Sequence, residues 1–127
     1  GLGVEKNVQK GLAFLEKSAA LGEVHSQYNL GLIYRIGEDV EQDLTKAEHW
    51  FRHAATRGLA AAQIDLGILY IKGEGIEADF SESFKWILLG NMNGDERGER
   101  LKDYCTENFD KEYLDEGFKL AQEFVQK

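Results

Sequence analysis

Proline is missing from all 127 residues of this sequence, where average usage would give about six. Cysteine occurs once, as Cys105, which excludes an internal disulfide and a zinc site built from several cysteines. Basic residues are scarce as well, since 15 Lys and Arg face 23 Asp and Glu for a net charge of −8. Nucleic-acid binding requires a basic surface, so that class of partner is excluded.

Long apolar runs are also missing. The longest covers six residues, 66–71, far below the roughly 18 that a membrane span needs. A start at Gly1 offers neither an initiator Met nor a signal-like segment, so we expect a fragment or processed chain. We therefore expect a soluble chain and leave its compartment, cytoplasmic or exported, undetermined. With 43% hydrophobic residues, the chain can still bury a core.

What the sequence does have is an internal repeat of 36 residues without insertion or deletion. The repeat relates three glycines, three large aromatic residues and three β-branched residues, and it pairs Leu-Gly and Tyr in two units. These sets are Gly22, Gly58 and Gly94; Phe14, Trp50 and Trp86; Val4, Val40 and Ile76; and Leu30-Gly31 and Tyr34 with Leu66-Gly67 and Tyr70. Such a period is typical of stacked supersecondary units.

Each unit is predicted to contain two helices. In the second unit, the first helix ends at Gly37, because glycine commonly follows a helix C-terminus. Asp43 then occupies the position of an N-cap, which Asn7 and Asp79 occupy in the neighbouring units. Apolar residues at helical spacing follow it, and the second helix ends at Gly58. Two such helices cannot bury their apolar stripes alone, so neighbouring units must stack.

Glycines inside the predicted first helices indicate close packing between helices. Gly31 and Gly67 recur at the same position of successive units. Glycine in a helix costs up to about 1 kcal/mol relative to alanine. A costly residue that is repeated predicts a close crossing of backbones at each helix pair.

These residues resemble the Sel-one-like repeat (SLR) family, a relative of the tetratricopeptide repeat. The second unit carries the family pattern in Leu30-Gly31, Tyr34, Gly37, Val40, Asp43, Lys46-Ala47, Trp50-Phe51, Ala54-Ala55 and Gly58. The resemblance covers about the first three quarters of the chain. It implies an all-α fold, a right-handed α-α superhelix (solenoid) of 36-residue helical hairpins with a C-terminal helical cap. It also implies a protein-binding scaffold without intrinsic chemistry.

The expected organisation is a single repeat domain over residues 1–127. It divides into a partial repeat at 1–22, repeats at 23–58 and 59–94, and C-terminal capping helices at 95–127, where the register is lost. The array opens part-way through a unit, so we expect the first helix of that unit to lie upstream. The helix near Phe14 would then have an uncovered face, which predicts weak self-association through the N-terminal end.

Binding is expected along a concave groove that the first helices line. Carried over through the shared Leu-Gly and Tyr positions, the tetratricopeptide resemblance places nine residues on that face: His25, Tyr28, Leu32, Arg35, Ile36, Ile64, Ile68, Ile71 and Lys72. An apolar stripe of this kind typically marks an interaction site, and Arg35 and Lys72 suit acidic groups of a protein or peptide partner. The alternative is that a tightly curled superhelix, or a cap that folds back, buries these isoleucines.

No catalytic residue, cofactor site or metal site is predicted. His49 and His53 have a spacing that can hold a metal, but no third ligand lies near in sequence, so we interpret them as two exposed histidines. Cys105 is expected to be a small buried core residue. Two alternatives to a binding module remain. One is a β-lactam-binding or hydrolysing enzyme, because a cysteine-rich branch of the family is linked to that chemistry, although its cysteine pairs are missing here. The other is a structural spacer.

Overall fold

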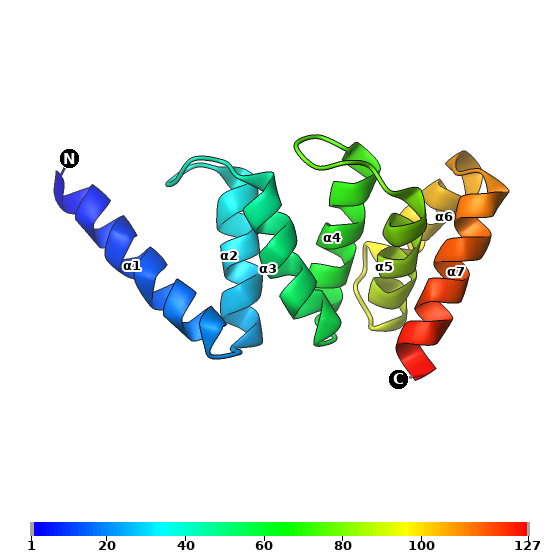
Figure 1. Cartoon of the computed structure of the whole chain (residues 1–127), viewed down its shortest axis with the longest axis horizontal. Helices are drawn as coiled ribbons and strands as arrows, with labels where there is room; N and C mark the ends of the chain where they lie inside the picture. Colours follow the sequence, from blue (N-terminus) through cyan, green and yellow to red (C-terminus); the bar gives the residue numbers. More distant parts are fainter. Residues whose placement is uncertain (1, 127) are drawn as a thin grey trace.

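The computed structural model describes residues 2–126, and side chains from residue 7 onward. Within that part of the chain there are seven helices and no strand. They are α1 (Leu2–Ala20), α2 (Val24–Ile36), α3 (Leu44–Thr56), α4 (Ala60–Lys72), α5 (Phe80–Met92), α6 (Gly98–Asn108) and α7 (Lys111–Gln126). The helices follow one another along a row, with the termini at opposite ends (Figure 1). The chain is thus the all-α superhelix that the repeat predicts.

The ends of the repeat helices have the predicted chemistry. Gly37 has a φ of +72°, and its N–H donates to the Ile33 carbonyl, which ends α2. The Asp43 carboxylate accepts from the Lys46 N–H at 3.0 Å and begins α3. Asp79 accepts from the Glu82 N–H in the same way at α5. Each such cap stabilises its helix by about 1 kcal/mol.

The expected N-cap at Asn7 is wrong, because α1 runs through this residue without a break. The two later caps depend on the preceding helix of their own unit. The Asp43 N–H donates to the Tyr34 carbonyl at 2.9 Å, and the Asp79 N–H donates to the Tyr70 carbonyl at 3.1 Å. Among residues 2–126 no first helix precedes Asn7 to supply such a carbonyl. Nothing therefore turns the chain there, and the helix continues.

The two helical glycines lie at close crossings, as predicted. A Cβ at Gly31 would lie 2.5 Å from Phe51 Cε1 and 3.0 Å from Phe51 Cγ on α3, which is too close for any side chain. A Cβ at Gly67 would lie 2.7 Å from Ile87 Cγ1 and 3.1 Å from the Ser83 carbonyl oxygen on α5. The Ser83 hydroxyl also donates to the Gly67 carbonyl at 2.8 Å. The missing side chains let each first helix touch the second helix of its unit.

One main core runs along the array, and it contains the repeated aromatic and small residues. Leu30, Phe51, Leu66 and Trp86 are buried in it. Helices α6 and α7 both pack against α5, and α6 contributes the fully buried Cys105 to a second cluster. That residues 95–127 act as a cap, and that the chain divides at 22, 58 and 94, stay predictions.

Candidate partner-binding surface

The nine residues expected in the groove differ in exposure along α2 and α4. On α2, His25 and Ile36 are exposed, while Tyr28, Leu32 and Arg35 are half-buried. On α4, Lys72 is exposed, Ile68 and Ile71 are half-buried, and Ile64 is buried. We call six of the nine the first-helix surface, and one of them, Leu32, also packs against the main core. Its members are His25, Leu32, Arg35, Ile36, Ile68 and Lys72.

The expectation that Ile64 lines an open groove is wrong. Its side chain is 0% exposed. Its Cδ1 and Cγ1 both lie 2.6 Å from the position that a Cβ of Gly90 would take, so the glycine on α5 makes room for this isoleucine. Ile71 is partly withdrawn in a similar way, since it packs against the cluster of Phe84, Ile87 and Cys105. The surface is therefore less apolar than the sequence suggests.

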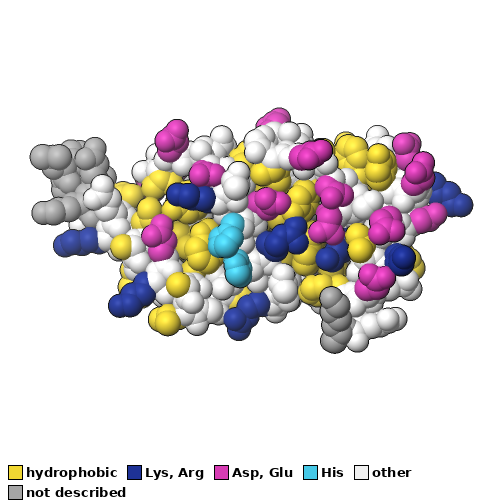
Figure 2. Space-filling model, in the orientation of Figure 1, with side chains coloured by type: hydrophobic (Ala, Val, Ile, Leu, Met, Phe, Trp, Pro, Cys, Tyr) yellow, Lys and Arg dark blue, Asp and Glu magenta, His cyan; other side chains and the backbone are white. Residues whose placement is uncertain are grey.

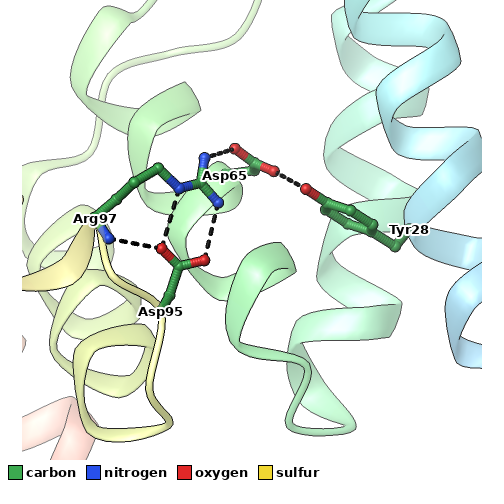
Figure 3. Close-up of polar contacts among 4 residues, drawn as sticks. All are labelled: Tyr28, Asp65, Asp95 and Arg97. Carbon is green, nitrogen blue, oxygen red and sulfur yellow. Dashed lines mark hydrogen bonds and ion pairs between the residues drawn. The ribbon is translucent and has the colours of Figure 1, made fainter.

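Tyr28 takes part in a chain of polar contacts that joins successive units (Figure 3). Its hydroxyl donates to Asp65 Oδ2 at 2.6 Å. Asp65 Oδ1 accepts from Arg97 Nη1 at 2.8 Å, and Arg97 also contacts Asp95 through its side chain and its backbone N–H. Tyr28 lies on α2, Asp65 on α4, and Arg97 immediately before α6. Polar bonds thus tie α2 to α4, and α4 to the segment that precedes α6.

These contacts matter for stability because the central carboxylate, Asp65, is buried. The Asp65 side chain is 5% exposed, whereas that of Arg97 is 42% exposed. A buried carboxylate needs its partners, because an unpaired buried charge is costly. Burial and the hydrogen bond to Asp65 raise the pKa of Tyr28 to about 12. The hydrogen bonds to Asp95 and Asp65 raise the pKa of Arg97, and those from Arg97 lower the pKa of Asp95. Near neutral pH the Tyr28 hydroxyl therefore stays protonated, Arg97 stays cationic and Asp95 stays ionised.

Sequence reasoning missed Asp65 and Arg97. A signal was present for Asp65, because it is the single acidic residue in α4, whose other residues before Lys72 are apolar or small apart from Gln63. An isolated acid in an apolar helix predicts a buried pair. Arg97 gave no comparable signal, since it lies among the many charges that follow Asp95.

Two cations border the first-helix surface. Arg35 is half-buried, and its Nε is buried without a hydrogen-bond partner among the described residues. Lys72 is exposed at the equivalent end of α4, where it is the last residue of the helix. Cationic side chains at the surface suit a carboxylate, which accepts charge-assisted hydrogen bonds.

The histidine pair and the cysteine that the sequence analysis considered show no sign of a reactive or metal-binding site among the described residues. His49 and His53 are exposed, and their rings lie 4.6 Å apart. Among the described residues, no group of three or more His, Cys, Asp or Glu side chains is arranged to hold a metal ion. Burial raises the pKa of the Cys105 thiol to about 12, which suppresses the reactive thiolate. None of the helices over residues 2–126 combines the length and apolar character of a membrane span.

These features define a helical-hairpin repeat protein whose first helices share a polar chain and a partly apolar surface. The sequence profile described as Sel1 repeat matches residues 1–23, 24–59 and 60–95. The chain therefore belongs to the Sel1 repeat family. Members of this family act in general as helical scaffolds for protein interaction.

Solved structures with the same fold include two bacterial proteins. One is c5321, described as a protective antigen present in uropathogenic Escherichia coli strains displaying an SLR fold. It is 31% identical with a TM-score of 0.86, and the match covers 93% of this chain and 26% of that one. The other is a Sel1 repeat protein from Oxalobacter formigenes, 24% identical with a TM-score of 0.72, covering 83% and 47% of the two chains.

The chain is shorter than either of these proteins. It spans about a quarter of the first and about half of the second. Comparison with curated proteins finds no match.

Proposed function

We propose that the chain is a non-enzymatic scaffold that binds a peptide or an amphipathic helix of a partner protein along the first-helix surface. The observation that carries the proposal is the apolar stripe of Leu32, Ile36 and Ile68, with the cations Arg35 and Lys72 beside it. Ile36 is 51% exposed, so it offers apolar area to a partner beside the half-buried Leu32. An amphipathic helix places its apolar face into such a surface.

The relative position of the two helices supports the same proposal. The hydrogen bond between Tyr28 and Asp65 holds α2 beside α4. Leu32 lies one turn beyond Tyr28, and Ile68 lies one turn beyond Asp65, so we expect the two side chains to form one patch. Arg35 and Lys72 then stand at the same end of that patch. A partner with apolar residues followed by a carboxylate fits this order.

The enzyme alternative receives no support from the side chains. Cys105, the one cysteine of the sequence, is fully buried with a raised pKa. The cysteine-paired chemistry of the β-lactam alternative has no counterpart here. A structural spacer stays open, and it differs from a scaffold in retaining no ligand on the first-helix surface.

Weak self-association through α1 is a second proposed property. Phe14 is 70% exposed and Leu21 is 81% exposed. Leu12 and Leu15 pack against the core of the array from the same helix. Large apolar side chains at this exposure commonly mark a contact surface. We propose that α1 pairs with another copy of the chain when the protein is concentrated.

A random-peptide display library, panned on the intact protein, tests the scaffold proposal. The bound peptides are then titrated into ¹⁵N-labelled protein, and the shifted amides are mapped. We expect the shifts to lie on α2 and α4. Ile68→Asp should weaken binding by about 30-fold, equivalent to about 2 kcal/mol for an anchor residue, and circular dichroism should remain helical.

Phe118→Asp on α7 is the matched control, because Phe118 is another exposed large apolar residue, at 54%. It should leave the affinity unchanged. Shifts confined to α3, α5 and α7, or equal affinity for Ile68→Asp and the native protein, contradict the proposed surface. Failure of the library to yield any binder favours the spacer.

A further inference from the structure

A cavity of about 670 Å³ lies between the end of α1, the start of α2 and one face of α3. This volume is in the range of small-molecule sites. Its lining includes Ala19, Gln27, His49, Trp50, His53 and Arg57. Histidine side chains lie over α3, near the middle of the face shown in Figure 2. The cavity shares no lining residue with the first-helix surface.

The lining is cationic in an acidic chain. The chain has 23 Asp and Glu residues, but none of the described residues that line the cavity is acidic. Two arginines and two histidines do line it. Arg52 is already engaged, because it contacts Tyr70 and Glu82. Arg57 therefore supplies the charge that a ligand would meet, and that charge favours an anion. Burial and the neighbouring His49 lower the pKa of His53, so its imidazole contributes hydrogen-bonding nitrogens.

Gln27 provides a second, independent feature that points to a ligand. Its side chain is 4% exposed, and its Nε2 donates to the Ala19 carbonyl at 3.1 Å. Its Oε1 has no hydrogen-bond partner among the described residues. Exchanging the two amide atoms would break the bond to Ala19, so the carbonyl oxygen is fixed as the free group. A buried carbonyl oxygen without a donor is costly, and a ligand N–H or O–H satisfies it.

In the next repeat, the equivalent glutamine has a hydrogen-bond partner for its carbonyl oxygen. Gln63 corresponds to Gln27 and donates to the Ala55 carbonyl at 3.1 Å, while its Oε1 accepts from Asn93 Nδ2 at 2.9 Å. The residue that corresponds to Asn93 is Arg57, which makes no such bond. The guanidinium of Arg57 lies near the turn instead, with Nη1 3.2 Å from the position of a Cβ at Gly22.

A second lining residue of the cavity, His53, also differs between the two repeats. The residue that corresponds to His53 is Leu89, which is buried. The exposure of the equivalent tryptophans differs as well, since Trp86 is 1% exposed whereas Trp50 is half-buried. The second unit thus has an open, cationic cavity where the third unit has filled core. Two substitutions, His53 for leucine and Arg57 for asparagine, contribute to the difference, together with α7, whose Phe124 ring contacts Trp86 at 5.4 Å.

Trp50 supplies an apolar wall. Its ring lies 4.8 Å from the His49 ring and 5.8 Å from the His53 ring. Flat aromatic faces bind apolar and aromatic groups. A fitting ligand therefore combines an anion, a hydrogen-bond donor close to it and an apolar group.

We propose that this cavity binds the carboxylate end of an N-acylated amino acid, the group that ends a peptide chain. The carboxylate lies against Arg57 and His53. The amide N–H next to it donates to Gln27 Oε1, and the apolar side chain packs on Trp50. The site is additional to the first-helix surface and does not depend on it.

The test uses N-acetyl-L-phenylalanine as the probe, titrated into the intact ¹⁵N-labelled protein. The chain has two tryptophans, so the two indole N–H signals, assigned with Trp50→Phe, report on the cavity and on the filled core. We expect a saturable shift of the Trp50 signal and a constant Trp86 signal. The methyl ester, which lacks the charge, and 3-phenylpropionate, which lacks the N–H, should each bind at least about tenfold more weakly, or about 1.4 kcal/mol.

Variants distinguish probe binding in the cavity from nonspecific attraction of the probe to positive charge. Arg57→Ala should weaken probe binding by at least about tenfold, whereas Arg100→Ala, which removes an equal charge at an exposed position of α6, should not. The double variant His53→Leu with Arg57→Asn places at these two positions the residues that the next repeat has there. It should lose the probe while keeping or raising the melting temperature.

Three results overturn the proposal. One is the lack of a saturable Trp50 shift with folded native protein. Another is equal loss of affinity in Arg57→Ala and Arg100→Ala. The third is native affinity in the double variant.

Discussion

The Tyr28 hydroxyl donates a 2.6 Å hydrogen bond to Asp65 Oδ2, and the two residues lie 37 positions apart on the first helices of successive units. On the other side of Asp65, Arg97 binds the second carboxylate oxygen at 2.8 Å. One buried carboxylate therefore joins an earlier unit to a later one. Its loss should affect the whole array.

Asp65→Ala should lower the free energy of unfolding by about 2 kcal/mol. Hydrogen bonds to a charged group are worth about 1.5–3 kcal/mol, and the exposure of Arg97 keeps the effect toward the lower part of that range. Urea unfolding followed by circular dichroism measures the change. Asp115→Ala, at an exposed position of α7, is the control and should change stability by less than about 0.5 kcal/mol. Equal midpoints for the two variants would show that the carboxylate is not structurally important.

Alkaline pH should destabilise the native protein through Tyr28. The folded-state pKa is about 12, raised from 10.0 by burial and by Asp65. The folded protein therefore holds this proton over a range in which the unfolded chain has released it. The stabilisation is complete below pH 10 and is lost as the pH rises from 10 to about 12.

Unfolding measured across that range should show a shallower decline for Tyr28→Phe, because the titrating group is gone. Tyr34 has a pKa of about 12 through burial and Glu16, so some decline should remain. Tyr113→Phe, at an exposed tyrosine, is the control. An unchanged slope in Tyr28→Phe would contradict the pKa shift.

Gly67→Ala should destabilise the protein although alanine is the better helix former. The new Cβ would lie 2.7 Å from Ile87 Cγ1 and 3.1 Å from the Ser83 carbonyl oxygen. Overpacking of this kind costs about 1–3 kcal/mol. Gly11→Ala is the control, because nothing lies within 4 Å of its Cβ position, and it should be stabilising by up to about 1 kcal/mol. Thermal unfolding distinguishes the two, and melting points that rise in both variants would contradict the close crossing.

Phe14→Glu should reduce self-association. Phe14 is 70% exposed on α1, and a carboxylate there would oppose burial against another copy. Sedimentation velocity over a range of concentrations measures the effect. Phe118→Glu, which adds the same charge at an exposed phenylalanine of α7, should associate as the native protein does. A native chain that stays monomeric at every concentration argues against an interface on α1.

The sequence predicted the helices well because residues that begin and end helices recur in each repeat. Gly37, Asp43 and Asp79 each specify a helix end through local geometry, and Gly31 and Gly67 mark the close crossings. Local rules failed at Asn7, where the cap depends on a carbonyl from a preceding helix. A residue type can suggest a cap, but the turn also needs something to fold against.

The candidate surface was predictable only in part. The tetratricopeptide resemblance placed Leu32, Ile36 and Ile68 at or near the surface, where the structure also has them. It could not show that Ile64 is buried, because that depends on Gly90 in another helix. The cavity beside Trp50 was equally hidden, because α7 covers the equivalent Trp86 and this coverage cannot be read from the repeat.

The arrangement of neighbours along the row has a consequence for how the protein opens. Helix α1 packs substantially against α2 alone, whereas α5 has α4, α6 and α7 around it. Amide protons in α1 should therefore exchange with solvent through local fraying long before those of α5, which should exchange only on global opening. Ala19 in the last turn of α1 accepts from Gln27, so an opening of α1 that reaches this turn also removes one wall of the cavity. Occupancy of that cavity and order at this end of the array are thus thermodynamically linked, and each should strengthen the other.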